Sequence, residues 1–202
     1  MLIYLIIIIT AYLLGNISTS YIVAKRLAGV DIRTQGSGNA GSTNVLRTLG
    51  KKAGALTFIG DVLKGLIAVL IARFIAYGVN LDDTTCAYIA VVAVVLGHNY
   101  PVFLGFKGGK GVATSLGSML GMNPLVALLC LGFFIIIVAI TKYVSLGSML
   151  GIGLSPVIMM INHNTKGVLV TLFLTISVAI THKENIKRLL NGTERKLGQK
   201  KN

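Results

Sequence analysis

The chain begins with MLIYLIIIITAYLLGNISTSYIVA (residues 1–24), an almost uninterrupted apolar run that is followed by Lys25 and Arg26. A helix needs about 20 apolar residues to cross the hydrocarbon core of a bilayer, so this run predicts a membrane-spanning helix. No basic residue precedes the run and two follow it, which is the reverse of a cleavable signal peptide. We therefore expect an uncleaved first helix with its N-terminus outside.

The composition of the whole chain leads to the same class of protein. Hydrophobic residues make up 54% and charged residues 12% of the 202 positions, whereas an average soluble domain has about 25% charged residues. So few charges cannot cover a water-facing surface, and a disordered chain is excluded for the same reason. Residues 1–202 are expected to form a single integral membrane domain. Cys86 and Cys130 lie in apolar runs without a paired motif, so neither a disulfide nor a zinc site is predicted.

Charge distribution decides the number of membrane crossings. Further apolar runs cover residues 53–77, 85–104, 112–122, 124–140, 144–161 and 167–181. Eleven residues in the run 112–122 reach only about 16 Å as a helix, half a bilayer. If this run nevertheless crosses, the segments that carry the whole net charge of +13 all face one side: 25–52, 105–111, Lys142 and 182–202. This arrangement satisfies the positive-inside rule. The prediction is an all-α, polytopic protein with seven transmembrane helices, one of them short, an N-terminus outside and a cytoplasmic C-terminus.

Four ionisable residues fall inside the apolar runs: Asp61, Lys64, His98, and Arg73, which is near the outer end of its run and can snorkel. Asp61 and Lys64 are three positions apart, so a helix places them on one face, where they can pair. A charged residue in the membrane is a functional candidate, but a mutually satisfied structural pair is an equal alternative. His98, near the cytoplasmic end of its run, is expected to be a hydrogen-bonded structural histidine.

The first segment with chemical potential is GSGNAGSTNVLR (36–47). Its glycines allow several backbone N–H groups to converge on an anion, and Arg47 adds a planar fork that suits phosphate. The glycine spacing also fits a dinucleotide-binding loop, but that motif requires a preceding strand, and a membrane helix precedes it here. A flexible linker is the alternative, although a linker needs no such mixture of polar side chains. The candidate phosphate-binding residues are Ser37, Gly38, Asn39, Gly41, Thr43, Asn44 and Arg47.

The second segment is KGGKGVAT (107–114), which leads into the short apolar run. Backbone N–H groups, the helix dipole and two ammonium groups would all favour an anion there. The spacing does not fit a nucleotide P-loop, because glycine follows the second lysine. An ordinary basic loop is the alternative. The candidate residues are Lys107, Gly108, Gly109, Lys110 and Gly111.

The third segment is HKENIKRLLNGTE (182–194). His182 and Asn185 share one helix face because they are three positions apart, although the segment also fits an amphipathic tail on the membrane surface. Ser145 and Ser148 follow Lys142 on the same predicted side. Two phosphate-type segments and a histidine at one membrane face predict that two phosphate groups are bound together beside the lipid.

Several chemistries are not expected. The chain has no paired carboxylates for metal-assisted phosphoryl transfer, and its three scattered histidines make no metal cluster. No nucleophile elbow occurs in a strand–helix context. We therefore expect neither a metal nor a cofactor. Nucleic acid is not an expected partner either, since the basic residues cluster between apolar runs and follow membrane topology.

Taken together, the three segments resemble the signature motifs of a bacterial membrane family, the acyl-phosphate-dependent glycerol-3-phosphate acyltransferases. Residues 37–47 match Ser-Gly-Asn-x-Gly-x-Thr-Asn-x-x-Arg, and residues 107–114 match Lys-Gly-Gly-Lys-Gly-Val-Ala-Thr. Residues 182–194 match a motif that begins His-Arg/Lys-Glu-Asn-Ile and ends Gly-x-Glu. The resemblance spans nearly the whole chain. Ala40 stands where many members have proline, which should affect only the stiffness of the loop.

The resemblance implies transfer of a fatty acyl group from acyl phosphate to the 1-hydroxyl of glycerol 3-phosphate, as the first step of bacterial phospholipid synthesis. The products would be lysophosphatidic acid and phosphate, formed without a metal or a covalent acyl-enzyme. It also implies a multi-pass protein of the bacterial cell membrane with a cytoplasmic active site, acting as a monomer. The catalytic candidates are then Ser37, Arg47, Lys107, Lys110, His182 and Asn185, with Ser145 lining the substrate pocket. Either His182 or an oxygen of the donor's own phosphate would take the proton of the acceptor.

Two other classes of function were weighed. A phosphoester transporter also uses helix ends and basic residues to hold an anion, but it usually needs internal repeats and access from two sides, whereas the polar segments here share one face. A purely structural membrane subunit would leave both phosphate-type segments without a purpose.

Overall fold

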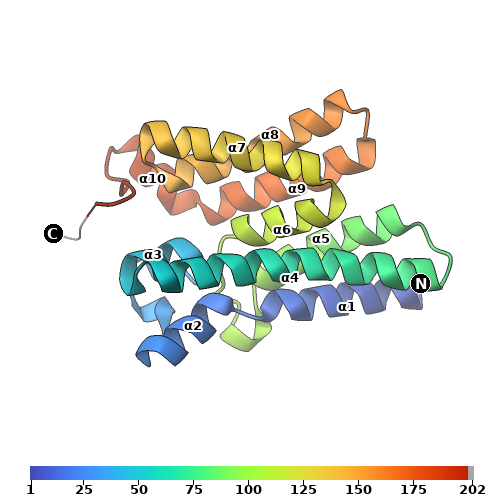
Figure 1. The fold of residues 1–202 in the computed structure, drawn as a ribbon, viewed down its shortest axis with the longest axis horizontal. Helices are drawn as coiled ribbons and strands as arrows, with labels where there is room; N and C mark the ends of the chain where they lie inside the picture. Colours follow the sequence, from blue (N-terminus) through green and yellow to red (C-terminus); the bar gives the residue numbers. More distant parts are fainter. Residues whose placement is uncertain (200–202) are drawn as a thin grey trace. The chain divides into compact units, whose positions relative to one another are not determined.

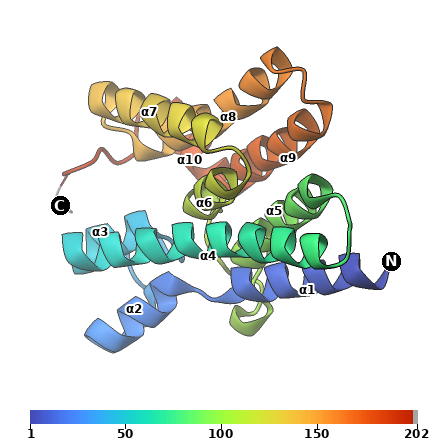
Figure 2. The same cartoon turned by 45° about the vertical axis from the view of Figure 1, so that its right-hand side comes forward.

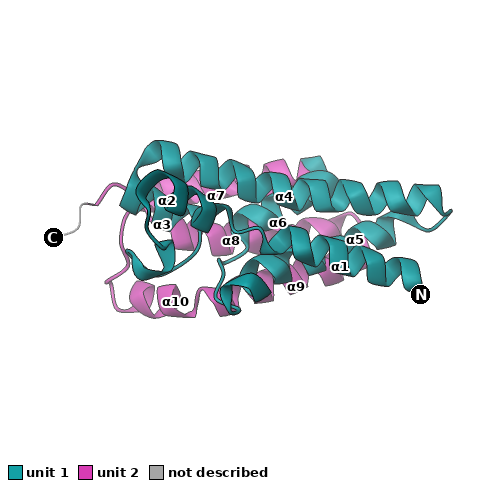
Figure 3. Cartoon of the chain, turned by 90° about the horizontal axis from the view of Figure 1, so that it is seen from below, with its two compact units in different colours: residues 1–124 teal, residues 125–202 magenta. Residues whose placement is uncertain are grey.

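The computed structural model describes residues 1–199, and all regular elements within that range are helices. The prediction of an all-α protein is therefore confirmed. The helices form two compact units, unit 1 (Met1–Pro124) and unit 2 (from Leu125 onward), which Figure 3 shows in different colours. The two units are described separately below.

Unit 1 is built on three long helices that lie side by side, α1, α4 and α5 (Figure 1). The short helix α6 packs against α4 and α5, while α2 and α3 contact α4 near its N-terminal end (Figure 2). The α-helices are α1 (Leu2–Asn16), α2 (Thr19–Ala28), α3 (Ser42–Leu49), α4 (Lys51–Gly78), α5 (Asp83–Asn99) and α6 (Val112–Met122). Two short 3-10 turns, η1 (Ile32–Thr34) and η2 (Val102–Leu104), complete the unit.

The sequence predicted one helix for the first apolar run, but the structure has two, separated at Ile17 and Ser18. The side chain of Ser18 accepts a hydrogen bond from the backbone N–H of Tyr21 and so caps α2. The ammonium group of Lys64 donates to the carbonyl oxygens of Gly15, at 3.1 Å, and Ile17, at 2.8 Å. These carbonyls belong to the end of α1, where helical partners run out. The break is therefore stabilised by a residue 47 positions further along the chain.

Small residues let the helices of unit 1 approach closely. A Cβ atom placed on Gly97 of α5 would lie 2.2 Å from the carbonyl oxygen of Tyr12 in α1. A Cβ atom on Gly117 of α6 would lie 1.9 Å from the carbonyl oxygen of Val62 in α4. Such backbone-to-backbone contacts are typical of membrane helices, and here they fix the positions of α5 and α6.

The predicted pairing of Asp61 and Lys64 in α4 is confirmed. Lys64 Nζ lies 2.9 Å from Asp61 Oδ1, and both side chains are buried. His98 of α5 lies on the same carboxylate, with its Nδ1 atom 3.5 Å from Asp61 Oδ1. The three side chains form one buried polar cluster in unit 1.

Unit 2 contains α7 (Pro124–Thr141), α8 (Val144–Ile161), α9 (Thr165–Thr181) and α10 (Lys183–Leu190). Helix α8 packs against α9, and its glycines Gly147 and Gly151 face Phe134 of α7. Helices α9 and α10 meet at His182 with a bend of 64°. This bend lies where the sequence predicted that the last apolar run meets the polar tail.

Five helical stretches within residues 1–199 are long and apolar enough to cross a membrane, or six if the bent pair α9 and α10 counts as one span. Large apolar side chains on α1, such as Leu5, Ile8 and Ile9, are exposed rather than packed inside the protein, as lipid-facing positions would be. Helix α6 has 11 residues and falls short of a full span. The count of seven crossings stays a prediction.

Candidate active site

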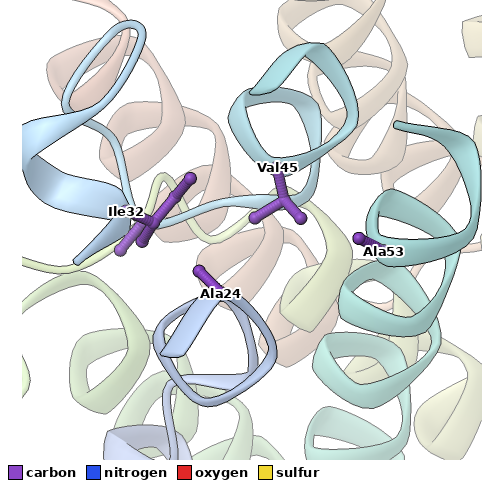
Figure 4. Close-up of a cluster of buried hydrophobic side chains, with 5 residues drawn as sticks. Ala24, Ile32, Val45 and Ala53 are labelled. Carbon is purple, nitrogen blue, oxygen red and sulfur yellow. The ribbon is translucent and has the colours of Figure 1, made fainter. Parts of the chain in front are cut away.

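The segment that carries the first motif is packed onto the ends of the neighbouring helices. Its apolar residues share a buried cluster with α2 and α4, which Figure 4 shows. The members of the cluster are Ala24, Ile32, Ala40, Val45 and Ala53. Burial of these side chains fixes the path of residues 30–50, which does not fit the alternative of a flexible linker. It also explains why α3 forms, since Val45 and Leu49 lie four apart on the face that packs against the cluster.

Asn44 is the residue that holds the first motif in shape. Its side-chain oxygen accepts a hydrogen bond from the backbone N–H of Ser37 at 3.0 Å. Its amide nitrogen donates to the carbonyl oxygens of Ile32, Gln35 and Asn39, at 3.0 to 3.2 Å. The side chain is buried and directed into the loop, so the expectation that Asn44 donates to a phosphate is corrected: it organises the residues around it.

The predicted nest of backbone N–H groups also differs in the structure. The N–H of Ser37 is bonded to Asn44, and that of Gly38 is bonded to the carbonyl of Gln35 at 2.9 Å. Helix α3 begins at Ser42 after Gly41, and the first N–H groups of a helix have no partner within it. The first turn of α3, with Thr43, and the exposed side chains of Ser37 and Arg47 belong to the same segment.

The second motif is anchored to the end of α5. The N–H groups of Gly108 and Gly109 donate to the carbonyl oxygens of Asn99, at 3.2 Å, and His98, at 3.1 Å. These two groups are therefore not the ones that would bind an anion, which corrects that part of the prediction. Gly111 has φ +80° and is the N-cap of α6, so the N–H groups of the first turn of α6 begin directly after the motif's lysines.

The two motifs of unit 1 meet at one point. A Cβ atom placed on Gly109 would lie 2.8 Å from the carbonyl oxygen of Ala40 and 2.1 Å from Nε2 of His98. Only glycine fits between these atoms. The structure therefore brings the segments 36–47 and 107–114 together, as the sequence analysis expected, and places a buried histidine beneath the contact.

A second tie joins the same parts of unit 1. The guanidinium of Arg33 forms an ion pair with Asp31 at 2.7 Å and donates to the carbonyl oxygen of Leu104 at 2.8 Å. The hydrogen bonds from Arg33 hold the pKa of Asp31 below its ordinary value. This tie links the turn before the first motif to the turn before the second.

Two hydroxyl groups near the second motif stand out. Thr114 and Ser115, in the first turn of α6, are fully buried, and their hydroxyl oxygens have no hydrogen-bond partner among residues 1–199. Buried polar groups are normally hydrogen-bonded. Thr114 and Ser115 follow Lys110 by four and five positions in the sequence.

The third motif is organised by Glu194, in unit 2. One carboxylate oxygen of Glu194 accepts hydrogen bonds from Ser145, at 2.8 Å, and Asn185, at 2.7 Å, and the other accepts from Arg188 at 2.8 Å. Burial raises the pKa of Glu194, but the three hydrogen bonds outweigh this effect and hold the pKa below its ordinary value. The carboxylate therefore stays charged and gathers two predicted site residues, Ser145 and Asn185, around itself.

Glu194 is the last residue of the third motif, and the sequence alone predicted no role for it. The Gly-x-Glu ending of that motif was the available signal.

His182 lies at the bend between α9 and α10. Its Nδ1 atom lies 2.9 Å from the carbonyl oxygen of Val178, and the side chain is buried. Because a carbonyl oxygen can only accept a hydrogen bond, Nδ1 donates to it and carries a proton. The backbone of α9 thus orients the imidazole ring.

No group of three or more His, Cys, Asp or Glu side chains that could hold a metal ion occurs within the described part of the chain. Cys86 and Cys130 are both free and buried.

This fold and site define a class of integral membrane protein in which two basic, glycine-rich segments are held together at the polar ends of the helices. The family model described as glycerol-3-phosphate acyltransferase matches residues 5–192. The chain belongs to the glycerol-3-phosphate acyltransferase family.

Relatives and a solved structure match over almost the full length. The chain is 69% identical over 198 residues to a glycerol-3-phosphate acyltransferase of Clostridioides difficile (strain 630), covering 98% of this chain and 97% of the relative. It is 47% identical to the protein of the same name from Alkaliphilus metalliredigens (strain QYMF), covering 98% of each chain. A crystal structure of PlsY, an integral membrane glycerol 3-phosphate acyltransferase in its glycerol 3-phosphate form, has a TM-score of 0.88 and 41% identity over 96% of each chain. A lysophosphatidic acid form of PlsY matches with a TM-score of 0.86 and 41% identity, over 96% of this chain and 95% of that chain.

Proposed function

We propose that this chain transfers a fatty acyl group from acyl phosphate to the 1-hydroxyl of glycerol 3-phosphate, releasing lysophosphatidic acid and phosphate. The observation that carries the proposal is the contact of the two glycine-and-base motifs at Gly109 and Ala40 in unit 1. Solved relatives in glycerol 3-phosphate and lysophosphatidic acid forms support the acceptor and the product.

Unit 1 supplies the phosphate-binding residues in this proposal. Ser37, Thr43 and Arg47 act together with the first turn of α3, and Lys107 and Lys110 act with the first turn of α6. Both substrates carry phosphate, so like charges must be neutralised before the reacting atoms can approach each other. A set of cations and helix N-termini with few carboxylates meets that need. Gly38, Asn39, Gly41, Gly108, Gly109 and Gly111 give these segments their shape.

In this proposal the glycerol moiety is bound by His182, Asn185 and Ser145. Asn185 and Ser145 both donate to Glu194, so the faces that they present to a substrate are fixed. A fixed hydrogen-bonding surface lowers the entropic cost of orienting the acceptor hydroxyl.

The proposed reaction is a direct transfer. The 1-oxygen of glycerol 3-phosphate attacks the acyl carbonyl carbon, the bond from that carbon to the phosphate oxygen breaks, and phosphate leaves with the electron pair. Acyl phosphate is a mixed anhydride and is already activated, so no serine or cysteine nucleophile and no metal is required. The departing anion is stabilised by the same basic groups that bound it. The acceptor proton goes to Nε2 of His182 or to an oxygen of the phosphate.

His182→Gln distinguishes the two routes for the proton. If histidine is the base, kcat falls by roughly 100-fold or more, the usual contribution of general-base catalysis. If the phosphate takes the proton, kcat holds and only the KM for glycerol 3-phosphate rises.

The topology forms part of the proposal. We place seven crossings with the N-terminus outside, counting α6 as a short crossing helix, and a monomer with a single catalytic domain in the bacterial cell membrane. The clustering of the net charge of +13 in four segments supports a cytoplasmic position for the polar helix ends. Labelling of single cysteines at position 82 and at position 107 in intact cells tests it, since only the first should react with an impermeant reagent.

The activity is tested with detergent-purified protein, palmitoyl phosphate and labelled glycerol 3-phosphate in the presence of a chelator. Palmitoyl-CoA serves as the control donor. Labelled lysophosphatidic acid should form from palmitoyl phosphate alone. Product formed only from the thioester, or only after metal addition, would contradict the proposal.

A further inference from the structure

The buried cluster of Asp61, Lys64 and His98 belongs to none of the three motifs. The exposed fractions of these residues are 1%, 5% and 6%. Burying charged groups costs several kcal/mol unless partners compensate for the lost water, and ionisable residues at membrane depth usually have a function. The cluster lies entirely within unit 1, on α4 and α5.

Lys64 connects the cluster to the break in the first span. Its ammonium group donates to the carbonyl oxygens of Gly15 and Ile17, and lies 2.9 Å from Asp61 Oδ1. The ammonium thus makes two hydrogen bonds to carbonyl oxygens and an ion pair with Asp61, whose Oδ1 atom has no hydrogen-bond partner among the described residues. The ion pair holds the Asp61 carboxylate beside Lys64.

His98 connects the same carboxylate to the second motif. Its Nδ1 atom faces Asp61 at 3.5 Å, while the Nε2 side of the ring lies against Gly109, where a Cβ atom would be only 2.1 Å away. The carbonyl oxygen of His98 also accepts the N–H of Gly109 at 3.1 Å. Both the ring and the backbone of His98 therefore support the loop 107–111 from below.

We propose that His98, oriented by Asp61, is a positioning residue that sets the conformation of the loop 107–111 and thereby the affinity of its phosphate site. The inference rests on the proposed role of that loop in binding the phosphate of a substrate. Gly109 is held between the His98 ring and the carbonyl of Ala40, so a displaced ring changes the contact between both phosphate-binding motifs. The side chains of the cluster touch no substrate; they act through the loop.

The test compares kinetics with stability in the full-length purified enzyme. The variants are His98→Gln, Asp61→Asn and the double variant, assayed with palmitoyl phosphate and glycerol 3-phosphate. Thr57→Val is the matched control, because Thr57 is buried in α4 and its hydroxyl donates only to Ala53. For each protein the KM for both substrates, kcat and the thermal unfolding midpoint are measured.

Each single variant should raise the KM for at least one of the two substrates by about tenfold, equivalent to about 1.4 kcal/mol, while kcat stays within about threefold of wild type. The double variant should be no worse than the more affected single variant, because both changes act on one loop. The substrate whose KM rises identifies the phosphate held by the loop. An unchanged KM for both substrates in both single variants, or a loss confined to kcat, overturns the inference.

Asp61→Asn leaves the Lys64 ammonium without its counter-charge and can prevent folding. Asp61→Glu is therefore the second variant, since it keeps the charge and only displaces the carboxylate. A folded Asp61→Glu enzyme should raise the same KM by less than His98→Gln does. If neither folded variant changes either KM, the positioning role is wrong.

Alanine variants of Lys107 and Lys110 separate this inference from the proposed function. If they leave both KM values unchanged, the loop is not a phosphate site and the proposed assignment itself fails. If they raise a KM that His98→Gln does not change, only the positioning role fails.

Discussion

Asn44→Ala should lower kcat/KM by about two orders of magnitude while leaving the helices of the membrane core folded. The Asn44 side chain bonds four backbone groups in and just before the first motif. These are the N–H of Ser37 and the carbonyl oxygens of Ile32, Gln35 and Asn39. Without its side chain these groups lose their partners, and residues 32–39 can leave the conformation that aligns Ser37 with the first turn of α3.

The magnitude follows from the hydrogen bonds. The two amide hydrogens of Asn44 serve three carbonyls, so the four contacts are equivalent to about three full hydrogen bonds at about 1 kcal/mol each. A loop destabilised by about 3 kcal/mol must be reordered by the substrate, which reduces apparent transition-state binding by roughly 150-fold.

The assay measures kcat/KM with palmitoyl phosphate and glycerol 3-phosphate, together with the thermal unfolding midpoint. Thr34→Ala is the control, since Thr34 lies in the same segment and its exposed hydroxyl donates to the carbonyl oxygen of Asp31 and accepts only a long contact, of 3.4 Å, from Gln35. That variant should stay within about fivefold of wild type, the equivalent of one hydrogen bond. An Asn44→Ala enzyme as active as the control would refute the role of Asn44 in shaping the motif.

Three further changes follow from the structure. Glu194→Gln should lower activity and the unfolding midpoint at neutral pH. The folded pKa of Glu194 lies below its ordinary value of 4.5, so the charged carboxylate stabilises the protein above that pH, and this contribution is lost as the pH falls through the folded pKa. Unfolding scans of wild type should therefore show an acid-dependent loss of stability that the variant lacks. Gly117→Ala should destabilise the protein by about 1 to 3 kcal/mol, since the methyl group would overlap the backbone of Val62; chemical unfolding in mixed micelles measures it, and an unchanged midpoint would count against the close helix crossing. Arg33→Lys should weaken the link between the two motifs of unit 1, because lysine cannot bond Asp31 in a bidentate manner and reach Leu104 as well. The lost hydrogen bond is worth about 1 kcal/mol, so the KM for a substrate should rise several-fold. Kinetics equal to wild type would contradict this.

Apolar patterning was sufficient to predict most helices of this protein. The run 144–161 became α8 with the same bounds, and the run 112–122 became α6. The break at Ile17 and Ser18 was not predictable from local pattern, since apolar residues continue on both sides. It depends on Lys64, which is distant in sequence and supplies donors to the freed carbonyls. Helix α3 was missed because its small and polar residues are also typical of a loop.

The candidate site shows the same division. Composition indicated that the glycine-rich segments could present N–H groups to an anion, but not which of these groups are bonded within the protein. The N–H groups of Ser37, Gly38, Gly108 and Gly109 are bonded to partners up to 11 positions away in sequence. Glu194 could not be assigned a role because one of its partners, Ser145, lies 49 positions before it. Tertiary contacts, rather than local pattern, decide these roles.

The position of Glu194 has a consequence for biosynthesis. Ser145 and Asn185 acquire their shared partner only when residue 194 has been added to the growing chain, after the last apolar helix, α9, has been completed at Thr181. A polypeptide that stops at residue 193 would insert all of its hydrophobic segments and still lack the carboxylate that aligns these side chains. Activity should therefore require synthesis through residue 194, and not only through the end of α9.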